Sequence, residues 1–219
     1  MTRGGRQIVP RPPVWSTVDR APWTPGLGGP PALDLVVGSI PSTDRPVQPA
    51  FEGARPAAVL VTLADGETGP EVLLTRRSWN LRHHRGEISF PGGRMDPGES
   101  AIDTALREAH EEVGLDPDRV EVVGELEHLN TVVSRSYIIP KVAVVTGERP
   151  ELRAAAAEVE RIMWVPLAEL VAPGTYHGEI WGTPPTDRLL HFFELSDETV
   201  WGATAHMLVD LLTRPERGR

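Results

Sequence analysis

The chain has 219 residues, with 22 basic and 31 acidic residues and a formal net charge of −9. This acidic balance argues against a non-specific nucleic-acid binder, which needs a basic surface to release counterions. The absence of cysteine excludes disulfides, zinc–thiolate sites and thiol nucleophiles. No apolar run approaches the roughly 20 residues of a membrane span, and the N-terminus lacks the apolar region of a signal peptide, so we expect a cytoplasmic protein.

Residues 1–54 are rich in proline and glycine. Eleven of the 22 prolines fall in about the first quarter of the chain, and a glycine cluster occupies residues 25–31. Because proline fixes φ and removes a backbone donor, we expect an extended or loosely packed extension here, with residues 33–40 as its only apolar run. A partly disordered tail is the alternative interpretation. We predict a folded domain over residues 55–214 and a short tail at 215–219.

Strand and helix patterns follow in order beyond this extension. The β-type runs at 57–63 and 71–75 flank the turn-rich sequence DGETGP, which predicts a hairpin. Further strands are predicted at 87–90, 120–126, 138–145, 164–167 and 189–194. Helices are predicted at about 100–113, 167–170 and 200–214. Strands dominate and helices pack on them, so the predicted class is α/β or α+β with a mixed sheet.

The predicted helix at 100–113 has clear start and stop signals. Ser100 is a potential N-cap with Asp103 in capping-box spacing, and Gly114 is placed for a left-handed C-cap. At 100° per residue, the apolar residues cover an arc of about 100°, which predicts one buried stripe. The acidic residues on the other side of the helix are Glu108, Glu111 and Glu112.

Like charges three and four positions apart repel on a helix surface, so these glutamates make sense if a cation lies between them. Carboxylate oxygens are hard ligands, which favours Mg²⁺ or Mn²⁺ over zinc or copper. The glycine-containing loop at 90–93 is predicted to bring backbone close to the start of the helix. Arg107 is within reach of Glu99 and Glu111 and can fix their geometry. A solvated surface cluster is the alternative interpretation.

Together with the preceding loop, these residues resemble the signature of the Nudix family, G-x5-E-x7-R-E-U-x-E-E-x-G-U, where U is apolar. The fixed positions are occupied by Gly93, Glu99, Arg107, Glu108, Glu111, Glu112 and Gly114. Ala109 and Leu115 occupy the apolar positions. The resemblance implies an α/β/α sandwich with a mixed sheet, a metal site on the signature helix, and hydrolysis of a nucleoside diphosphate linked to another group.

The resemblance also implies a role for each acid. Glu108 and Glu112 correspond to the usual metal ligands for Mg²⁺ or Mn²⁺. Glu111 corresponds to a third ligand or a participant in proton transfer. Glu99 and Arg107 correspond to orienting residues in the catalytic site.

The family's general base varies in position, which leaves Glu111 and Glu158 as candidates. Glu158 lies in a loop before the strand at 164–167, where a solvated acid is the alternative interpretation. In the implied mechanism, one or more cations would bridge the metal-binding glutamates and the diphosphate and would lower the pKa of a bound water. One of the two candidate bases then accepts the proton of that water.

A second, narrower resemblance lies upstream. Residues 73–93, LLTRRSWNLRHHRGEISFPGG, are similar to the pattern LLTxRSxxLRxHxGxxxFPGG of the coenzyme A diphosphatase subfamily. The segment WGATA at 201–205 is similar to another element of these enzymes. The matching residues that we expect to bind substrate are Arg77, Arg82, His84, Gly92 and Gly93. The resemblance covers roughly residues 55–212.

Coenzyme A carries a 3′-phosphate beyond its diphosphate, which requires cations outside the metal site. Residues 76–85 supply a basic patch in an otherwise acidic chain, and arginine forks suit phosphate oxygens. Pairing with surface acids is the alternative interpretation, chiefly for Arg76 and Arg85. The favoured function is metal-dependent hydrolysis of coenzyme A or acyl-CoA to 3′,5′-ADP and (acyl-)4′-phosphopantetheine.

Two other functions stay open. One is a Nudix hydrolase of another nucleoside diphosphate derivative, such as a nucleoside triphosphate, ADP-ribose or a dinucleoside polyphosphate. The other is a non-catalytic ligand-binding Nudix module, against which the intact glutamates argue. The expected partner is a small nucleotide substrate, with no nucleic acid and no membrane. The sequence leaves the oligomeric state open, a homodimer included.

Overall fold

The computed structural model describes residues 3–23, 32–42, 45–46, 48–49, 51–131 and 135–217. In this part of the chain, the strands of the larger sheet are β2 (Arg55–Gly66), β3 (Gly69–Arg77), β4 (Ile88–Ser89), β5 (Gly92–Arg94), β6 (Val120–Glu125), β7 (Leu129–Thr131), β8 (Ser136–Val145) and β9 (Val159–Pro166). Those of the smaller sheet are β1 (Trp15–Val18), β10 (Tyr176–Trp181), β11 (Arg188–Glu194) and β12 (Thr199–Trp201). The helices are α1 (Leu33–Gly38), α2 (Ala101–Val113), the 3₁₀ turn η1 (Pro117–Arg119), α3 (Leu167–Leu170) and α4 (Gly202–Arg217).

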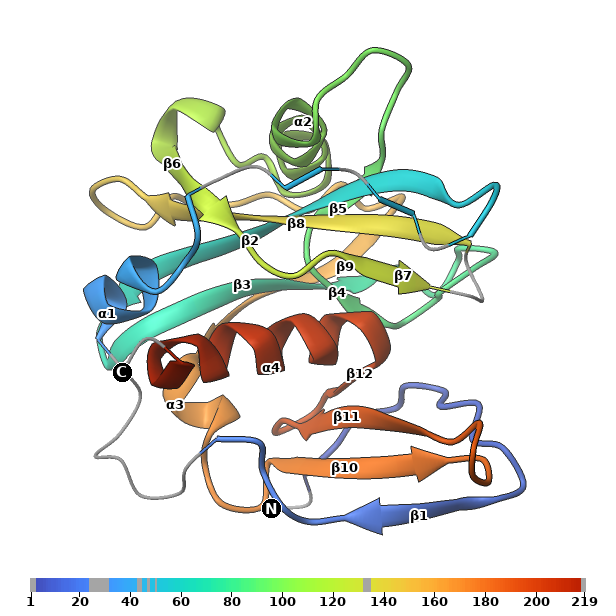
Figure 1. Cartoon of the computed structure of the whole chain (residues 1–219). Coiled ribbons are helices and arrows are strands. Elements are labelled where there is room, and N and C mark those ends of the chain that lie inside the picture. The colour runs from blue at the N-terminus through green and yellow to red at the C-terminus, as the bar shows by residue number, and fades with distance from the viewer. Residues whose placement is uncertain are drawn as a thin grey trace.

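The larger sheet is mixed and lies between two helices (Figure 1). Its central order is β4-β3-β2-β8-β6, while β5 pairs with β2, β7 with β8 and β9 with β3. The β2–β8 pair is parallel, and the other pairs are antiparallel. Helix α2 covers one face and α4 the other. The predicted α/β/α sandwich with a mixed sheet is confirmed.

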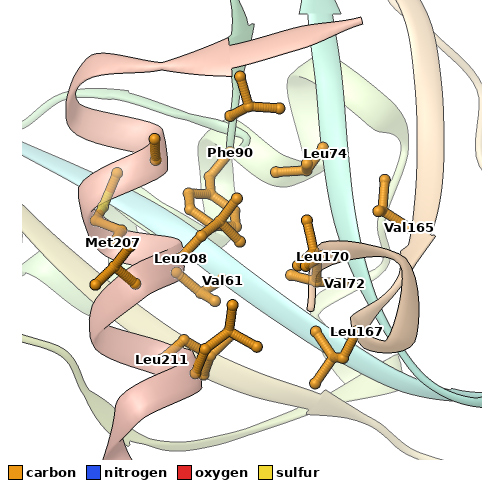
Figure 2. Close-up of a cluster of buried hydrophobic side chains, with 14 of the residues drawn as sticks. Val61, Val72, Leu74, Phe90, Val165, Leu167, Leu170, Met207, Leu208 and Leu211 are labelled. Carbon is orange, nitrogen blue, oxygen red and sulfur yellow. The ribbon is translucent and has the colours of Figure 1, made fainter. Parts of the chain in front are cut away.

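The central strand β2 is buried on both faces, which explains its nearly continuous apolar sequence. Successive side chains of a strand point to opposite faces. Leu60 therefore joins the cluster under α2, with Ala105 and Ala109. Val61 joins the cluster under α4, where it lies beside Leu208 (Figure 2). The sheet is thus held between the helix that carries the glutamates and the C-terminal helix.

The predicted caps of α2 are both present. The Ser100 hydroxyl accepts a hydrogen bond from the Asp103 backbone N–H at 3.2 Å and donates to its carboxylate at 2.6 Å. Gly114 adopts a left-handed φ of 69°, and its N–H closes on the His110 carbonyl at 2.9 Å. With both ends fixed, the acidic residues of the last two turns have defined positions.

The strands that the sequence analysis did not predict are β1, β5, β7, β10 and β12. Each has only three to six residues, too few to show a periodicity, and each forms by pairing with a strand elsewhere in the sheet. The C-terminal helix begins at Gly202 rather than at residue 200, because residues 199–201 pair with β11. It also extends to Arg217, past the predicted end at 214.

Part of the proline-rich extension packs on the smaller sheet. Strand β1 pairs with β10, with Trp15 opposite Trp181. The Arg11 guanidinium forms a two-bond fork with the buried Glu179, with shortest distance 2.7 Å. These contacts make the described part of the extension more ordered than its composition predicts, because a paired strand and an ion pair satisfy its polar groups.

The predicted division of the chain at residues 54 and 55 stays a prediction. The glycine cluster at 25–31 and the last two residues of the predicted tail lie outside the described residues. Within the described ranges, no helix combines the length and the apolar character that crossing a membrane requires.

Candidate active site

The three glutamates of α2 occupy three different environments. Glu112 is buried at 3% exposure, Glu108 is partly buried, and the side chain of Glu111 is 59% exposed. They do not form one solvated face. Seven residues separate Ala105 from Glu112, which puts Glu112 only about 20° from the buried stripe at 3.6 residues per turn. That angular position is the sequence signal from which its burial could have been predicted.

Two partners hold the buried carboxylate of Glu112. The Gly92 N–H donates to Oε2 at 3.2 Å, and Arg77 Nη1 donates to Oε1 at 3.3 Å. Burial raises the pKa of Glu112 to about 7, although Arg77 and the Gly92 amide oppose this shift. The charges of Glu108 and Glu158 raise the pKa further. A carboxylate that is this difficult to ionise favours a cation beside it.

Glu108 lies one turn before Glu112 and packs against β5. A Cβ at residue 93 would overlap the Glu108 carboxylate, so a larger residue there would displace this carboxylate. Arg107 Nη1 donates to Glu108 Oε1 at 3.0 Å. Burial is the largest cause that raises the pKa of Glu108, and the charges of Glu111 and Glu158 add to it. Glu108 and Glu112 therefore both favour a nearby positive charge.

The glycines of β5 lie beside the second half of α2, not at its start as the sequence predicts. Strand β5 pairs antiparallel with β2, with Gly92 opposite Val59 and Gly93 opposite Ala58. This pairing places the two glycines next to Glu112 and Glu108. The chain then needs residues 95–100 to return to the beginning of the helix.

Arg107 connects that returning loop to the acidic residues. Its guanidinium forks onto Glu99, with Nε to Oε1 at 2.8 Å and Nη2 to Oε2 at 3.0 Å, and its Nη1 reaches Glu111 at 3.2 Å. The Thr104 hydroxyl and the Asp96 N–H also donate to Glu99, at 2.7 and 3.1 Å. These donors, Arg107 first, lower the pKa of Glu99 to about 2. This geometry fits an orienting role for Glu99 and Arg107.

Glu158 reaches the same site from the loop before β9. The Ala155 N–H donates to the Glu112 carbonyl at 2.9 Å, which fixes this loop on the end of α2. The Ser78 N–H donates to the Glu158 carbonyl at 2.7 Å, which fixes the loop to the end of β3. The Glu158 charge raises the pKa of both Glu108 and Glu112, so the three carboxylates share one electrostatic site.

The predicted substrate-binding cations differ in position. Arg77 lies inside the site, on Glu112. Arg82 is exposed in the loop between β3 and β4. His84 adopts a left-handed φ of 54° and pairs with Glu87 at 2.9 Å, and this hydrogen bond raises the pKa of His84. The structure thus brings Arg77 to the glutamates and leaves Arg82 and His84 at the surface, in the loop between β3 and β4.

Arg76 pairs with a different acid. Its Nη1 donates to Glu198 Oε1 at 2.6 Å, and Arg161 reaches the same oxygen at 3.0 Å. Glu198 is 1% exposed, so these cations compensate a buried charge. Arg76 therefore has the structural pairing that the alternative interpretation of the basic patch predicts.

A family model described as the NUDIX domain matches residues 54–190, which is more than half of the chain. The chain belongs to the Nudix family. The matched residues include all the acids of the site, together with Arg77 and the two glycines of β5. The protein is a Nudix hydrolase, a pyrophosphohydrolase of nucleoside diphosphate derivatives.

Known relatives agree with this assignment. Nudix hydrolase 3 of Caenorhabditis elegans is 40% identical over 141 residues, which cover 62% of this chain and 58% of that protein. The chain thus spans little more than half the length of that relative. The uncharacterized Nudix hydrolase NudL of Escherichia coli K12 is 38% identical over 160 residues, covering 72% of this chain and 81% of that protein.

One solved structure supports the fold alone. The MutT/nudix family protein from Enterococcus faecalis has a TM-score of 0.51 at 17% identity, over 78% of this chain and 65% of that chain.

The donor set of this Nudix site fits a divalent cation. Glu108 and Glu112 are partly buried and buried carboxylates one turn apart, both have raised pKa values, and the glycine backbone of β5 lies beside each of them. Among the described residues, no three acidic or imidazole side chains form a ready cage for a metal. Mg²⁺ needs no such cage, because it keeps several waters and binds one or two carboxylates together with substrate phosphate oxygens.

Replacing Glu112 with Gln is expected to stabilise the metal-free protein at pH 8, because the change removes a buried charge. In the unfolded chain this carboxyl ionises with its ordinary pKa of 4.5, whereas the folded group keeps its proton up to about pH 7. The wild type therefore loses stability as the pH rises through this window, by at most about 3 kcal/mol. Urea unfolding in EDTA at pH 4 and pH 8 measures the difference.

The exposed neighbour provides the matched control. Glu111→Gln should change the unfolding free energy by less than about 0.5 kcal/mol at either pH. The unfolding free energy of Glu112→Gln should exceed that of the wild type by more at pH 8 than at pH 4. The same difference at both pH values would show that Glu112 does not titrate as its burial implies.

Proposed function

We propose that this Nudix hydrolase cleaves the diphosphate of coenzyme A or acyl-CoA, releasing 3′,5′-ADP and (acyl-)4′-phosphopantetheine. The observation that carries the proposal is the position of residues 73–93, whose sequence resembles the coenzyme A diphosphatase pattern. Arg77 and Gly92, near the two ends of this segment, both contact Glu112. The basic residues between them, at 82–85, are exposed.

This arrangement supplies cations for two separate phosphate groups. Arg77 lies against a carboxylate of the proposed metal site, where the diphosphate would be bound. Arg82 belongs to the exposed loop and is free to meet a phosphate farther along the substrate. Coenzyme A carries such a phosphate at the ribose 3′ position. We therefore assign Arg77 to the diphosphate and Arg82 to the 3′-phosphate.

Glu108 and Glu112 are the proposed ligands of Mg²⁺ or Mn²⁺, with Glu111 as a candidate third ligand. When bound, such an ion neutralises phosphate charge and lowers the pKa of water. Gly92 and Gly93 allow close approach of backbone to this site.

Proton transfer is assigned to Glu158 in this proposal. Its charge acts on both Glu108 and Glu112, whereas the Glu111 carboxylate is paired with Arg107. Glu158 accepts the proton of the attacking water, and the water oxygen forms the new bond to phosphorus as the bridging oxygen leaves. The hydrogen bonds between Arg107 and Glu99 hold the loop before α2 against the helix during this step.

A substrate panel tests the assignment directly. With Mg²⁺ or Mn²⁺ present, we expect 3′,5′-ADP from coenzyme A and acetyl-CoA, and little product from ADP-ribose, NADH or dGTP. Separation of the products by ion-exchange chromatography measures this, and EDTA should abolish turnover. Fast hydrolysis of another compound without release of 3′,5′-ADP from coenzyme A would end the coenzyme A assignment.

Alanine variants of Arg77 and Arg82 should distinguish the contact with the diphosphate from the contact with the 3′-phosphate. Arg82→Ala is expected to lower kcat/KM for coenzyme A by about tenfold while leaving dephospho-CoA unchanged, since one charge-assisted hydrogen bond is lost. Arg77→Ala should lower kcat/KM for both compounds by a similar factor. If Arg82→Ala lowers kcat/KM equally for coenzyme A and dephospho-CoA, Arg82 does not contact the 3′-phosphate.

The candidate bases are compared by the same amide replacement. Glu158→Gln is expected to lower kcat by about 10²-fold or more, in line with the usual contribution of a general base. Glu111→Gln should lower kcat by no more than about tenfold. Steady-state kinetics at saturating metal give both values, and the reverse order of effects would transfer the role to Glu111.

A further inference from the structure

A cavity of about 480 Å³ lies between the loop that follows β3 and the loop that precedes β9. Its volume falls within the range of small-molecule sites, about 300–1,000 Å³. One wall begins at Ser78, the residue after Arg77, and the other wall flanks Glu158. The lining of the cavity therefore includes the chain neighbours of Arg77 and Glu158, the two residues that the proposed function assigns to the diphosphate and to proton transfer.

The lining of this cavity combines an aromatic ring with small side chains and a polar rim. Trp79 supplies the ring, and Ala154 and Ala156 supply small side chains to the same lining. Asn80 and Glu160 are exposed and lie at the opening. An aromatic surface with amide and carboxylate groups at its edge suits a planar heterocycle that carries ring nitrogens and an amino group.

The Trp79 wall is supported by Gly86. A Cβ at residue 86 would overlap the Trp79 ring, so the ring packs directly on the glycine backbone. Gly86 has a left-handed φ of 70°, and its N–H donates to the Arg77 carbonyl at 3.1 Å. Gly86 thus connects the cavity wall to the arginine that contacts Glu112.

The N-terminal segment holds Gly86 in turn. Gln7 Nε2 donates to the Gly86 carbonyl at 3.1 Å and to Glu198 Oε2 at 2.5 Å. Gln7 Oε1 accepts from the Thr199 N–H at 2.8 Å. Gln7 lies outside residues 54–190, which the family model matches, so this support comes from a part of the chain outside the matched domain.

We propose that this cavity is the subsite for the nucleobase of the substrate, with Trp79 as its stacking surface and Gln7 as a positioning residue. The basic residues at 82–85 belong to the same loop, so the segment that supplies the stacking surface also supplies cations for a ribose phosphate. An acyl chain would leave the polar rim unused. The inference rests on the proposed function only in requiring a nucleotide substrate.

A comparison of the binding of AMP and of ribose 5-phosphate isolates the base, because AMP carries adenine where ribose 5-phosphate carries its anomeric hydroxyl. Isothermal titration with Mg²⁺ present should give tighter binding of AMP to the wild type. Trp79→Ala should weaken AMP binding by about tenfold, the usual effect of removing one base–aromatic stack, and leave ribose 5-phosphate unchanged. Trp79→Phe should stay within about threefold of wild type for both ligands.

Control variants outside the cavity show whether a change in AMP binding comes from the cavity or from a general effect of substitution. Trp15→Ala removes a half-exposed tryptophan from β1, in the other sheet, and should not change AMP binding. Gln7→Ala should raise the Kd for AMP by about threefold and speed exchange of the Gly86 amide hydrogen by about tenfold. Ile8→Ala changes the exposed neighbouring residue and should do neither.

Each outcome decides a separate point. Equal AMP affinity of Trp79→Ala and wild type, or wild-type binding of AMP no tighter than of ribose 5-phosphate, would overturn the subsite. Unchanged AMP binding and unchanged Gly86 exchange in Gln7→Ala would remove the role of the N-terminal segment. If coenzyme A is not hydrolysed but Trp79→Ala still weakens AMP binding, the nucleobase subsite is supported and only the coenzyme A assignment is wrong.

Discussion

A buried carboxylate is the constraint around which this site is organised. Glu112 is 3% exposed, and burial holds its pKa near 7 in spite of an arginine and a backbone amide within hydrogen-bond distance. Two hydrogen-bond donors do not offset the loss of hydration, so the ionised form requires further positive charge. In the proposed function, a divalent cation held by Glu108 and Glu112 would supply that charge.

The surrounding structure delivers the partners of this carboxylate from separate segments. Pairing of β5 with β2 brings Gly92 and Gly93 beside α2, pairing of β3 with β9 brings Arg77 and Glu158 together, and the Arg107–Glu99 fork fixes the loop between β5 and α2. The order of strands in the larger sheet therefore determines the electrostatics of the site. Helix α2 supplies the acidic residues, and the strand pairing places the glycines, the arginine and Glu158 around them.

Glu198 and the N-terminal segment extend this arrangement beyond the matched Nudix residues. Glu198, just before β12, holds Arg76 of β3 and Arg161 of β9, and it also binds Gln7. Gln7 then meets the carbonyl of Gly86 in the loop that resembles the coenzyme A pattern. A segment that reads as a proline-rich extension is in this way linked to the wall of a cavity beside the glutamates.

The sequence by itself determined α2, its caps at Ser100 and Gly114, the spacing of its glutamates, and the family, because these are properties of one continuous segment. It also indicated the mixed sheet through the apolar runs of β2, β3 and β8. Only the tertiary structure decided that Arg77 contacts Glu112 and that the glycines of β5 lie beside the second half of α2. Short strands and long-range contacts carry no periodic signal, since their stability comes from partners far away in the chain.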